Sequence, residues 1–582
     1  MSRRSSFRQD DPEWLRHMME LAICFVIAVI VLRGFVLEGY LISTGSMAPG
    51  LRGLHKQLHC PSCQYSFAFG VSFDESAGSS SDMDVRKQFA TCPNCGQINI
   101  NAGSVPKAHG DQLLVQKGVF DFRNPRRWET IVFLNPASPG EAYVKRVVGL
   151  PGESVRVIDG DLFIDGVIAR KDLQTQRDMR ISVFDMEHMP LTEDWQFPWA
   201  LQPGWNLTDG QLSFQPDDSA PGRQSDLVNP DGRSWLKFQW WRRASGIHVC
   251  EVPVPGDFED DWQICLTNLN RSPVTWTTRL TYDRDRQVLR MKGVMPYEMQ
   301  TAITSWPTSP EFRAAVYRLG ALSHASPVTD RYGYNSLVSS PEYPVHDLML
   351  ESSVSWEDPP EVISFQIPMN NDIYRLDFNP AENVAKLVMD STQQVIANRQ
   401  LDAIRSAGSQ RIQVELSNFD RRVIVAIDGE EVFERLDLPR NSAQAAAYAE
   451  RFAESDSVPD VRTALQTSEV IRQQSRTGIG VKGAGVTVKS LRLYRDVHYT
   501  PGRRTNAVKT ACVVERGNYF VQGDNSPVSS DSRNWPDPFV PHHLLIGKPF
   551  VVHLPSKPGK LTIGGVELPI RIPDLRRIRY IH

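Results

Sequence analysis

The sequence predicts a mainly β protein made of several folded units. Its 582 residues are far more than one domain usually uses, so three or more units are expected. Forty prolines and 38 glycines are scattered along the chain, which favours many turns and a β-rich body. The content of 41% hydrophobic and 23% charged residues is typical of a globular protein. A net charge of −4 argues against the nucleic-acid-binding class, which usually presents a basic face.

The one long apolar stretch, residues 18–37, predicts an N-terminal transmembrane helix. Its uncharged part, residues 21–32, is too short to cross a bilayer, but the longer stretch suffices if Glu20 and Arg33 reach toward the two interfaces. A cleaved signal peptide and a buried core helix are the alternatives, and no convincing small-x-small cleavage site follows the stretch. Four arginines precede it, which predicts a single-pass protein of the cell membrane with a cytoplasmic N-terminus and an extracytoplasmic body.

The remaining chain divides into segments that differ in composition and hydropathy pattern, some typical of strands and others typical of loops. Residues 109–170 alternate in hydropathy and contain Asp159-Gly160 and Asp165-Gly166, which predict tight hairpins. Residues 171–500 contain further alternating strands, one hairpin signal at Asp428-Gly429, and a helical pattern at residues 441–455. The predicted organisation is the following: cytoplasmic N-terminus 1–17, anchor 18–37, catalytic segments 38–57, 109–170 and 501–582, a small cysteine-containing insertion 58–99, and a β-sandwich insertion 171–500.

Four cysteines predict a structural zinc site. Cys60 and Cys63, and Cys92 and Cys95, form two C-x-x-C pairs with the spacing of a zinc ribbon, in which four thiolates close a tetrahedron. Disulfides are the competing interpretation, because the predicted topology puts this segment in an oxidising compartment. A redox-active C-x-x-C motif is the third interpretation of these cysteine pairs. Cys250 and Cys265 also have a spacing that permits a disulfide.

Ser46, in the segment STGSMAPGL, is a candidate nucleophile. A hydroxyl needs a base to take its proton, and the histidines of the chain lie in segments without a matching acid motif. A lysine that burial keeps neutral is the other solution, and Lys145 lies in the apolar strand AYVKRVVGLPGE. The structural alternatives are a turn residue for Ser46 and a strand-edge residue for Lys145.

These segments together resemble type I signal peptidases, the membrane-anchored Ser-Lys endopeptidases that remove signal peptides from exported preproteins. The resemblance rests on STGSMAPGL, GDQLLVQK, YVKRVVGLPGE and GDNSPVSSDSR, and it covers residues 15–55, 109–169 and 512–582. It implies a β-rich catalytic domain, substrates with small-x-small cleavage sites, contact with membrane lipid, no nucleic-acid partner and no cofactor for catalysis. Ser43, Trp128 and Ser526 depart from the usual family pattern.

The resemblance also implies a role for each matching residue. Ser46 would be the nucleophile, Lys145 the general base, and the Ser46 N–H with the Thr44 hydroxyl the oxyanion hole. The residues expected to support the site are Ser529, which would orient the lysine, the ion pair of Asp531 and Arg533, and Asp524. The residues expected to contact substrate are Ile42, Met47, Tyr143 and Val144. A membrane-anchored binding protein on a degenerate peptidase scaffold and a self-cleaving Ser-Lys protease are the alternative functions.

The segment 171–500 contains WNLTDGQLSF near its start and the strand-like IDGEEVFE and GIGVKGAGVTVKSLRLYRDV near its end. With these features the insertion resembles concanavalin-like or laminin-G-like jelly-roll sandwiches. Such folds often bind carbohydrate, so a carbohydrate or protein ligand is a possible partner of this unit. Its tryptophans offer stacking surfaces for sugars, although a role in the core is the favoured interpretation. They are Trp195, Trp199, Trp205, Trp235, Trp240 and Trp241.

Overall fold

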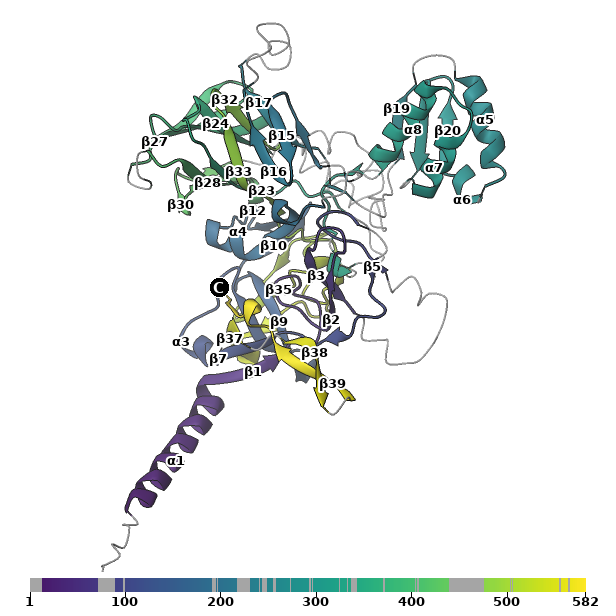
Figure 1. The fold of residues 1–582 in the computed structure, drawn as a ribbon. Coiled ribbons are helices and arrows are strands. Elements are labelled where there is room, and N and C mark those ends of the chain that lie inside the picture. The colour runs from purple at the N-terminus through teal and green to yellow at the C-terminus, as the bar shows by residue number, and fades with distance from the viewer. Residues whose placement is uncertain are drawn as a thin grey trace, which may run out of the picture.

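The computed structural model is mainly β, as predicted, and almost all of its strands pair antiparallel (Figure 1). The structure describes residues 13–581 except for 72–88, 98–99, 191–194, 196, 217–230, 240, 243–248, 255–257, 273, 293–294, 296, 324, 332, 336–342, 370–371, 403–404, 406–407, 439–475, 503, 505, 554–555 and 564–565. The helix predicted at residues 441–455 lies outside the described residues.

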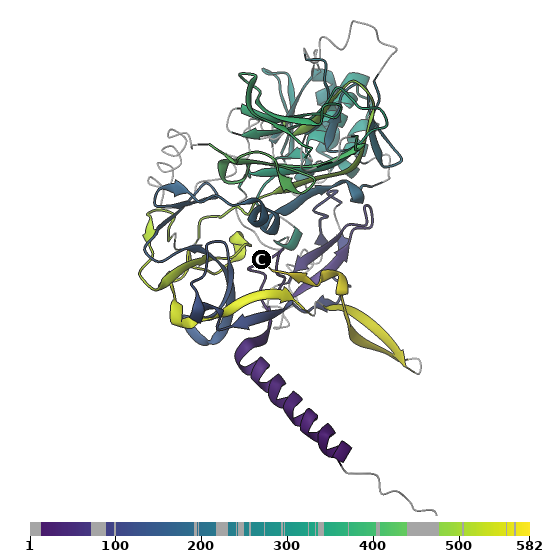
Figure 2. The same cartoon turned by 90° about the vertical axis from the view of Figure 1, so that its left-hand side faces the viewer.

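The N-terminal helix differs from the predicted anchor. Helix α1 (Glu13–Val31) continues into a π-helical turn, η1 (Leu32–Val36), and projects away from the body of the molecule (Figures 1 and 2). Among the described residues, no helix combines the length and the apolar character needed to cross a membrane. The predicted transmembrane helix over residues 18–37 is therefore not supported, and α1 ends at Val31 rather than at residue 37.

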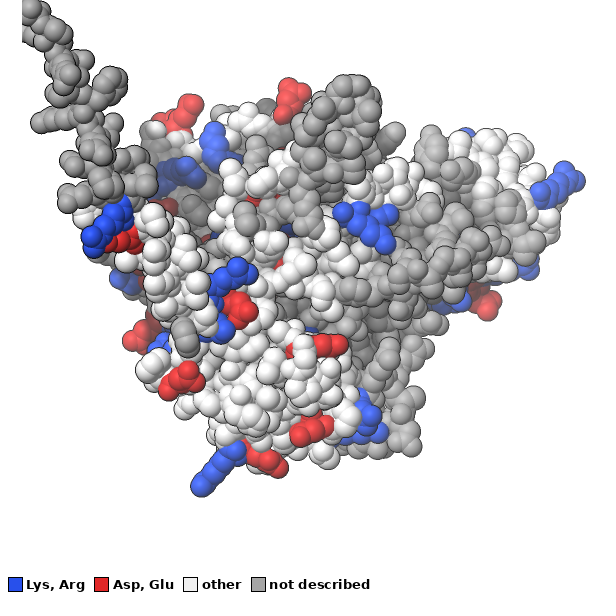
Figure 3. Space-filling model, turned by 90° about the horizontal axis from the view of Figure 1, so that it is seen from below, with Lys and Arg blue, Asp and Glu red and all other residues white. Residues whose placement is uncertain are grey.

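The surface of α1 is nevertheless apolar along its second half. Leu21 is 66% exposed and Phe25 is 69% exposed, and their aliphatic neighbours are exposed to a similar degree. Figure 3 views the molecule from the side on which α1 projects, where basic and acidic side chains are interspersed.

The first large sheet contains strands from all three predicted catalytic segments. They come from residues 37–41, 112–149 and 518–580, so the sheet brings distant segments side by side. In spatial order they are β1 (Leu37–Leu41), β7 (Gln112–Lys117), β37 (Leu545–Val552), β8 (Thr130–Asn135), β9 (Ser138–Gly149), β35 (Asn518–Gln522) and β36 (Val540–Pro541), with β40 (Arg579–Tyr580) paired to β37.

A four-stranded sheet beside it confirms the predicted hairpins. Its strands are β12 (Val167–Ile168), β11 (Asp161–Ile164), β10 (Ser154–Ile158) and β34 (Cys512–Val513). Asp159-Gly160 joins β10 to β11, and Asp165-Gly166 joins β11 to β12. All four turn residues have positive φ, from 50° to 86°, which is the backbone that two-residue hairpins of this twist require.

Two larger sheets face each other as a sandwich. One contains β15 (Trp205–Thr208), β16 (Gln211–Phe214), β33 (Val486–Arg495), β23 (Leu348–Ser355), β28 (Arg411–Ser417), β29 (Arg422–Ile427) and β30 (Glu430–Glu431), with β13 (Ile181–Asp185) and β31 (Leu436–Asp437) at its margins. The other contains β14 (Trp199–Leu201), β17 (Ser234–Phe238), β32 (Gly478–Lys482), β24 (Val362–Met369), β25 (Asp372–Asn379), β26 (Val384–Met389) and β27 (Gln394–Gln400).

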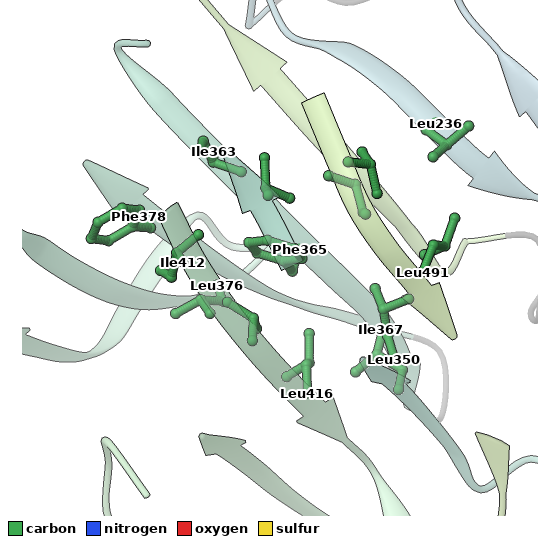
Figure 4. Packing of buried hydrophobic residues seen from close by; sticks show 14 of the residues in the cluster. Leu236, Leu350, Ile363, Phe365, Ile367, Leu376, Phe378, Ile412, Leu416 and Leu491 are labelled. Carbon is green, nitrogen blue, oxygen red and sulfur yellow. The ribbon is translucent and has the colours of Figure 1, made fainter. Parts of the chain in front are cut away.

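The sandwich core lies between these two sheets. Leu350, Ile412 and Leu416 from one sheet pack toward Phe365 and Leu376 from the other (Figure 4), and all five are fully buried. Burial of such side chains is worth about 1.5–3 kcal/mol each, so this core holds the insertion together.

Within the predicted sandwich segment the structure contains a separate α/β unit that the sequence analysis did not foresee. It lies beside the sandwich (Figure 1, teal) and has its own core around Leu289, Met291 and Phe312. Its elements are β19 (Val249–Pro253), α5 (Glu259–Leu269), α6 (Val274–Thr277), β20 (Leu280–Asp283), β21 (Val288–Lys292), α7 (Tyr297–Ser305) and α8 (Pro310–Ser323). The hairpin-like pair β18 (Trp241–Arg242) and β22 (Ala325–Ser326) flanks it.

Short elements complete the described chain. The cysteine segment contains β2 (His55–His59), β3 (Ser66–Gly70), β4 (Phe89–Ala90), β5 (Ile100–Asn101) and β6 (Lys107–Ala108), and β38 (Ser556–Ile563) with β39 (Val566–Pro573) forms a projecting hairpin (Figure 2). The short helices are α3 (Val119–Phe122), α4 (Leu173–Met179), η3 (Met186–His188), η4 (Gly333–Asn335), η5 (Phe419–Arg421), η6 (Ser526–Val528), η7 (His542–Leu544) and η8 (Leu575–Arg577).

Candidate active site

The serine segment is a closed loop that leaves the end of β1. The Ile42 N–H donates to the Asp111 carbonyl at 2.9 Å, and the Leu54 N–H donates to the Ser43 carbonyl at 3.2 Å, so the two ends of the loop are tied. Gly53 allows this closure, because a Cβ at this position would lie 2.3 Å from the Thr44 carbonyl carbon. The loop therefore holds Ser46 in a fixed, largely buried position, with 8% of its surface exposed.

The Lys145 amine contacts the Ser46 hydroxyl from strand β9 of the same sheet. It lies on β9, opposite Ile131 of β8, and its Nζ is 2.5 Å from the Ser46 Oγ. Only 3% of Lys145 is exposed. Burial lowers the pKa of the Lys145 amine to about 8, although nearby Asp531 opposes the shift. About a tenth of these amines is therefore neutral at pH 7 and about half near pH 8, and the neutral form can accept a proton from the hydroxyl.

Thr44 lies close to the same hydroxyl. Its Oγ1 is 3.3 Å from the Ser46 Oγ, and its side chain is exposed to solvent. An exposed hydroxyl beside the nucleophile is free to turn toward an incoming carbonyl oxygen, as the predicted role requires.

Asp531 and Arg533 form a buried ion pair beneath the site. The Arg533 Nη2 lies 2.7 Å from the Asp531 Oδ2, and both side chains are fully buried. Burial alone would raise the pKa of Asp531, but Arg533 outweighs it and holds that pKa below its usual value. Arg533 also donates to the Ser526 Oγ at 2.5 Å, so the serine that departs from the family pattern completes this network.

Ser529 lies beside the nucleophile but does not make the hydrogen bond to Lys145 that was predicted. Its hydroxyl is near enough to Asp531 to lower the pKa of that carboxyl, yet among the described residues it has no partner in hydrogen-bonding geometry. Gly523 explains the close packing here, because a Cβ at Gly523 would lie 2.3 Å from the Ser529 Oγ and 2.4 Å from the Ser46 carbonyl oxygen.

Asp524 has a partner that sequence reasoning missed. Arg146, the residue after Lys145, donates to both carboxylate oxygens of Asp524 at 2.7 and 2.6 Å, and both side chains are 8% exposed. Successive residues of a strand face opposite sides, so Arg146 fastens the back of β9 while Lys145 faces the serine. An arginine inside an otherwise apolar strand was the available signal.

The four predicted substrate-contacting residues fall into two neighbouring clusters. Ile42 and Met47 are buried together, with Val144 packed against them. Tyr143 packs against Phe133 and Trp535 in the adjacent cluster. Among the described residues, β35 pairs with β9 only from Arg146 onward, so the part of β9 that holds Tyr143 and Val144 is paired on the β8 side alone.

The four cysteines of the two C-x-x-C pairs converge on one point. The four Sγ atoms lie within 4.8 Å of one another, all four residues are buried, and the Cys60–Cys95 and Cys63–Cys92 sulfurs are 3.6 Å apart. Every cysteine of the described chain is a free thiol, including Cys250 and Cys265. Zn–S bonds of about 2.3 Å in a tetrahedron separate sulfurs by about 3.8 Å, so the donor set fits zinc.

Three of the six sandwich tryptophans are core residues, and the side chains of Trp240 and Trp241 lie outside the described residues. Trp199, Trp205 and Trp235 are between 2% and 4% exposed, so their rings are not available as stacking surfaces for a sugar. Trp195 instead packs against the cysteine segment and donates its indole N–H to the Cys95 carbonyl at 3.2 Å.

Two comparisons with known sequences point to one family. The family model for signal peptidase, peptidase S26, matches residues 96–214 and 424–554, which include Lys145 and Ser529 but not Ser46. The curated relatives include signal peptidase I of Leptolyngbya laminosa, 44% identical over 63 residues, and probable signal peptidase I-2 of a Synechocystis strain, 37% identical over 62. Each match covers 10% of this chain and about 30% of the relative, namely 31% and 28%. Over these segments the chain is similar to signal peptidases, and it spans less than a third of the length of these two relatives.

A comparison with solved structures returned matches of low similarity. A Caenorhabditis elegans galectin, LEC-6, matches 26% of this chain and 83% of its own at 11% identity and a TM-score of 0.15. A score this low carries no argument about the insertion.

Proposed function

We propose that this protein is a signal peptidase that removes N-terminal signal peptides from exported preproteins by means of Ser46 and Lys145. The observation that carries the proposal is the 2.5 Å contact between the Lys145 Nζ and the Ser46 Oγ, with the lysine buried and its pKa lowered to about 8. The family match and the curated relatives support the same reaction class.

In the proposed reaction the neutral Lys145 amine accepts the Ser46 proton as the Ser46 Oγ attacks the scissile carbonyl carbon. The oxyanion that forms accepts hydrogen bonds from the Ser46 N–H and the Thr44 hydroxyl, each worth roughly 10²–10³ in rate. The Lys145 ammonium then donates its proton to the leaving amine, which leaves the signal peptide as an ester on Ser46. A water gives a proton to Lys145 and attacks the ester carbonyl carbon. As the bond to the Ser46 Oγ breaks, Lys145 returns that proton to the serine, and the signal peptide leaves with a free carboxyl group.

Substrate would bind as an added strand. The stretch of β9 at Tyr143 and Val144 has one edge without a paired strand among the described residues, which suits an extended peptide. Val144, packed against the buried Ile42 and Met47, supplies an apolar surface beside the nucleophile, which favours small side chains near the scissile bond.

The proposed place of action is the extracytoplasmic surface of the cell membrane, where signal peptides emerge. The exposed apolar side chains of α1 support contact with lipid, since such a surface is unfavourable in water. The proposed zinc at Cys60, Cys63, Cys92 and Cys95 has a structural role and takes no part in cleavage.

Cleavage of a preprotein with a small-x-small site tests the proposal. Wild-type protein is expected to release the mature chain at that site, as shown by its N-terminal sequence, and Ser46→Ala and Lys145→Ala are expected to release none. Ser43→Ala is the matched control, because Ser43 lies in the same loop and only its backbone carbonyl is used. No cleavage by wild-type protein would favour the binding-protein alternative, and cleavage by either dyad variant would reject the mechanism.

A further inference from the structure

A short turn of the large insertion reaches the serine loop. The turn η4 (Gly333–Asn335) lies between the α/β unit and the sandwich in sequence, but in space it packs against β3 of the cysteine segment (Figure 1). Tyr334 and Asn335 are 7% and 5% exposed, so both side chains are committed to contacts within the protein.

Asn335 holds the amide of Asn525, the residue after Asp524. The two side chains exchange hydrogen bonds, with the Asn335 Nδ2 donating at 2.6 Å and the Asn525 Nδ2 donating at 2.9 Å. The Asn525 Nδ2 also donates to the Gly45 carbonyl at 2.8 Å, and its backbone N–H donates to the Ser46 carbonyl at 3.0 Å. Asn335 therefore fixes which way the Asn525 amide faces.

The carbonyl that Asn525 holds belongs to the peptide unit that carries the Ser46 N–H. A peptide unit is planar, so a hydrogen bond accepted by the Gly45 oxygen also sets the direction of the Ser46 N–H. That N–H is the backbone donor of the oxyanion hole in the proposed reaction. The Gly45 oxygen also accepts from the Ala48 N–H at 3.1 Å, so the orientation of this donor depends on that bond together with the amide pair of Asn335 and Asn525.

Tyr334 holds the same loop from another side. Its ring lies against Gly45, where a Cβ would be 2.3 Å from the ring, and against Gly70 of β3, where a Cβ would be 2.5 Å away. Its hydroxyl donates to the Leu54 carbonyl at 3.2 Å. The ring therefore fills the space between the serine loop and the cysteine segment, and neither glycine can be replaced without moving it.

We propose that Asn335, supported by Tyr334, is a positioning residue that orients the Ser46 N–H toward the oxyanion of the reaction. The insertion is then part of the catalytic apparatus, although none of its side chains touches the reacting atoms. This inference rests on the proposed peptidase function.

The test compares kcat and KM for preprotein cleavage by wild-type protein, Asn335→Ala and Asn335→Asp. Both variants lose the amide that donates to Asn525, and Asn335→Asp keeps the side-chain volume. We expect kcat to fall about 10- to 100-fold in both, because misdirecting one oxyanion donor costs no more than removing it. KM should stay within about twofold in both, and the pH midpoint should not move in Asn335→Ala, because that substitution adds no charge near Lys145. The loss caused by Asn335→Ala should largely vanish in an Asn525→Ala background, since the two amides act as a unit.

Asn383→Ala is the matched control. Asn383 is a buried asparagine of the sandwich, 3% exposed, whose Nδ2 donates to the Asp402 carboxylate at 2.7 Å. Its substitution should lower stability and leave kcat unchanged. An unchanged kcat in the Asn335 variants, a change in KM alone, or an equal loss of kcat in Asn383→Ala would overturn the inference. Failure of wild-type protein to cleave would refute the proposed function and this inference with it, whereas normal wild-type cleavage with active Asn335 variants refutes the inference alone.

Discussion

Lys145 lies in a buried environment that disfavours the charged form of its amine. It is buried on a strand, and the carboxylates that could keep it protonated are already paired, Asp531 with Arg533 and Asp524 with Arg146. These pairs satisfy the acids beneath the site, so desolvation decides the state of the amine and lowers the pKa of Lys145 to about 8.

Replacing Lys145 by methionine should abolish cleavage and stabilise the fold. The pKa of Lys145 is lowered in the folded protein, so protonation penalises folding below about pH 8, and the penalty disappears as pH rises toward the ordinary value of 10.5. The gain in unfolding free energy of Lys145→Met over wild type should therefore be largest at pH 6–7, as a rough working range, and shrink by pH 9. Chemical denaturation at several pH values measures it. A gain that grows with pH would contradict the neutral-lysine account.

Asp531→Asn should destabilise the protein strongly, because it leaves the fully buried Arg533 without its counter-charge. Breaking one partner of such a pair costs about 3–5 kcal/mol. Glu431→Gln is the control, since it breaks the exposed pair with Arg435 and should cost about 0–1 kcal/mol. Denaturant titrations of the two variants measure their free energies of unfolding. Equal losses of this free energy would show that the pair of Asp531 and Arg533 stabilises the fold no more than an exposed ion pair does.

Sequence motifs identified the residues that the structure brings to one site, but not all their partners. The resemblance to signal peptidases rests on short motifs, and these motifs contain Ser46, Lys145, Asp531 and Arg533. Asn335 could not be found this way, because it is 190 residues from Asn525 and lies in a segment without a motif. Its contact depends on how the insertion packs, which local sequence does not encode.

At the scale of single elements, short sequence motifs predicted the turns correctly where the turn needs a backbone conformation that few residues adopt. The Asp-Gly pairs adopt the positive φ angles of hairpin turns, because few other residues tolerate that region. The predicted anchor extended to residue 37, whereas α1 ends at Val31 and the chain continues as a π-helical turn and then as strand β1. Hydropathy alone did not give the position at which this helix ends.

Metal removal tests the four-cysteine element. We expect about one zinc per chain in purified protein and loss of that zinc in Cys92→Ser, with a lower melting temperature, because the cysteine segment has only a small core of its own. Metal analysis and thermal unfolding with and without chelator measure both effects. Cys24→Ser should keep the metal, since Cys24 lies on α1 away from the other sulfurs. Metal-free protein with the four thiols linked as disulfides would contradict the zinc assignment.

At the scale of the molecule, separate cores hold the catalytic sheet, the sandwich and the α/β unit. The sequence predicted the mainly β character from turn residues and alternation, but it did not reveal the α/β unit. The reason is physical: four short helices with mixed faces give a weak periodic signal beside strands of similar composition. A segment boundary inside an insertion depends on which residues share a core, and that is a property of the folded chain.

Separate cores predict that a large cavity in the sandwich leaves the chemistry intact. Phe365→Ala should destabilise the sandwich by about 3–5 kcal/mol, because Phe365 is fully buried between the two sheets. At a temperature where the variant stays folded, its pH midpoint for cleavage should equal that of wild type. Thermal unfolding and initial rates measure the two properties, and a shifted midpoint would show that the sandwich core sets the environment of Lys145.

The pH dependence of kcat/KM for preprotein cleavage tests the central claim most directly, because this quantity reports the ionisation of the essential base in the free enzyme. The buried Lys145 amine must be neutral to accept the Ser46 proton, so activity should rise with pH through a single midpoint near 8. A midpoint at the ordinary lysine value of 10.5, or a rate that does not change across this range, would contradict it.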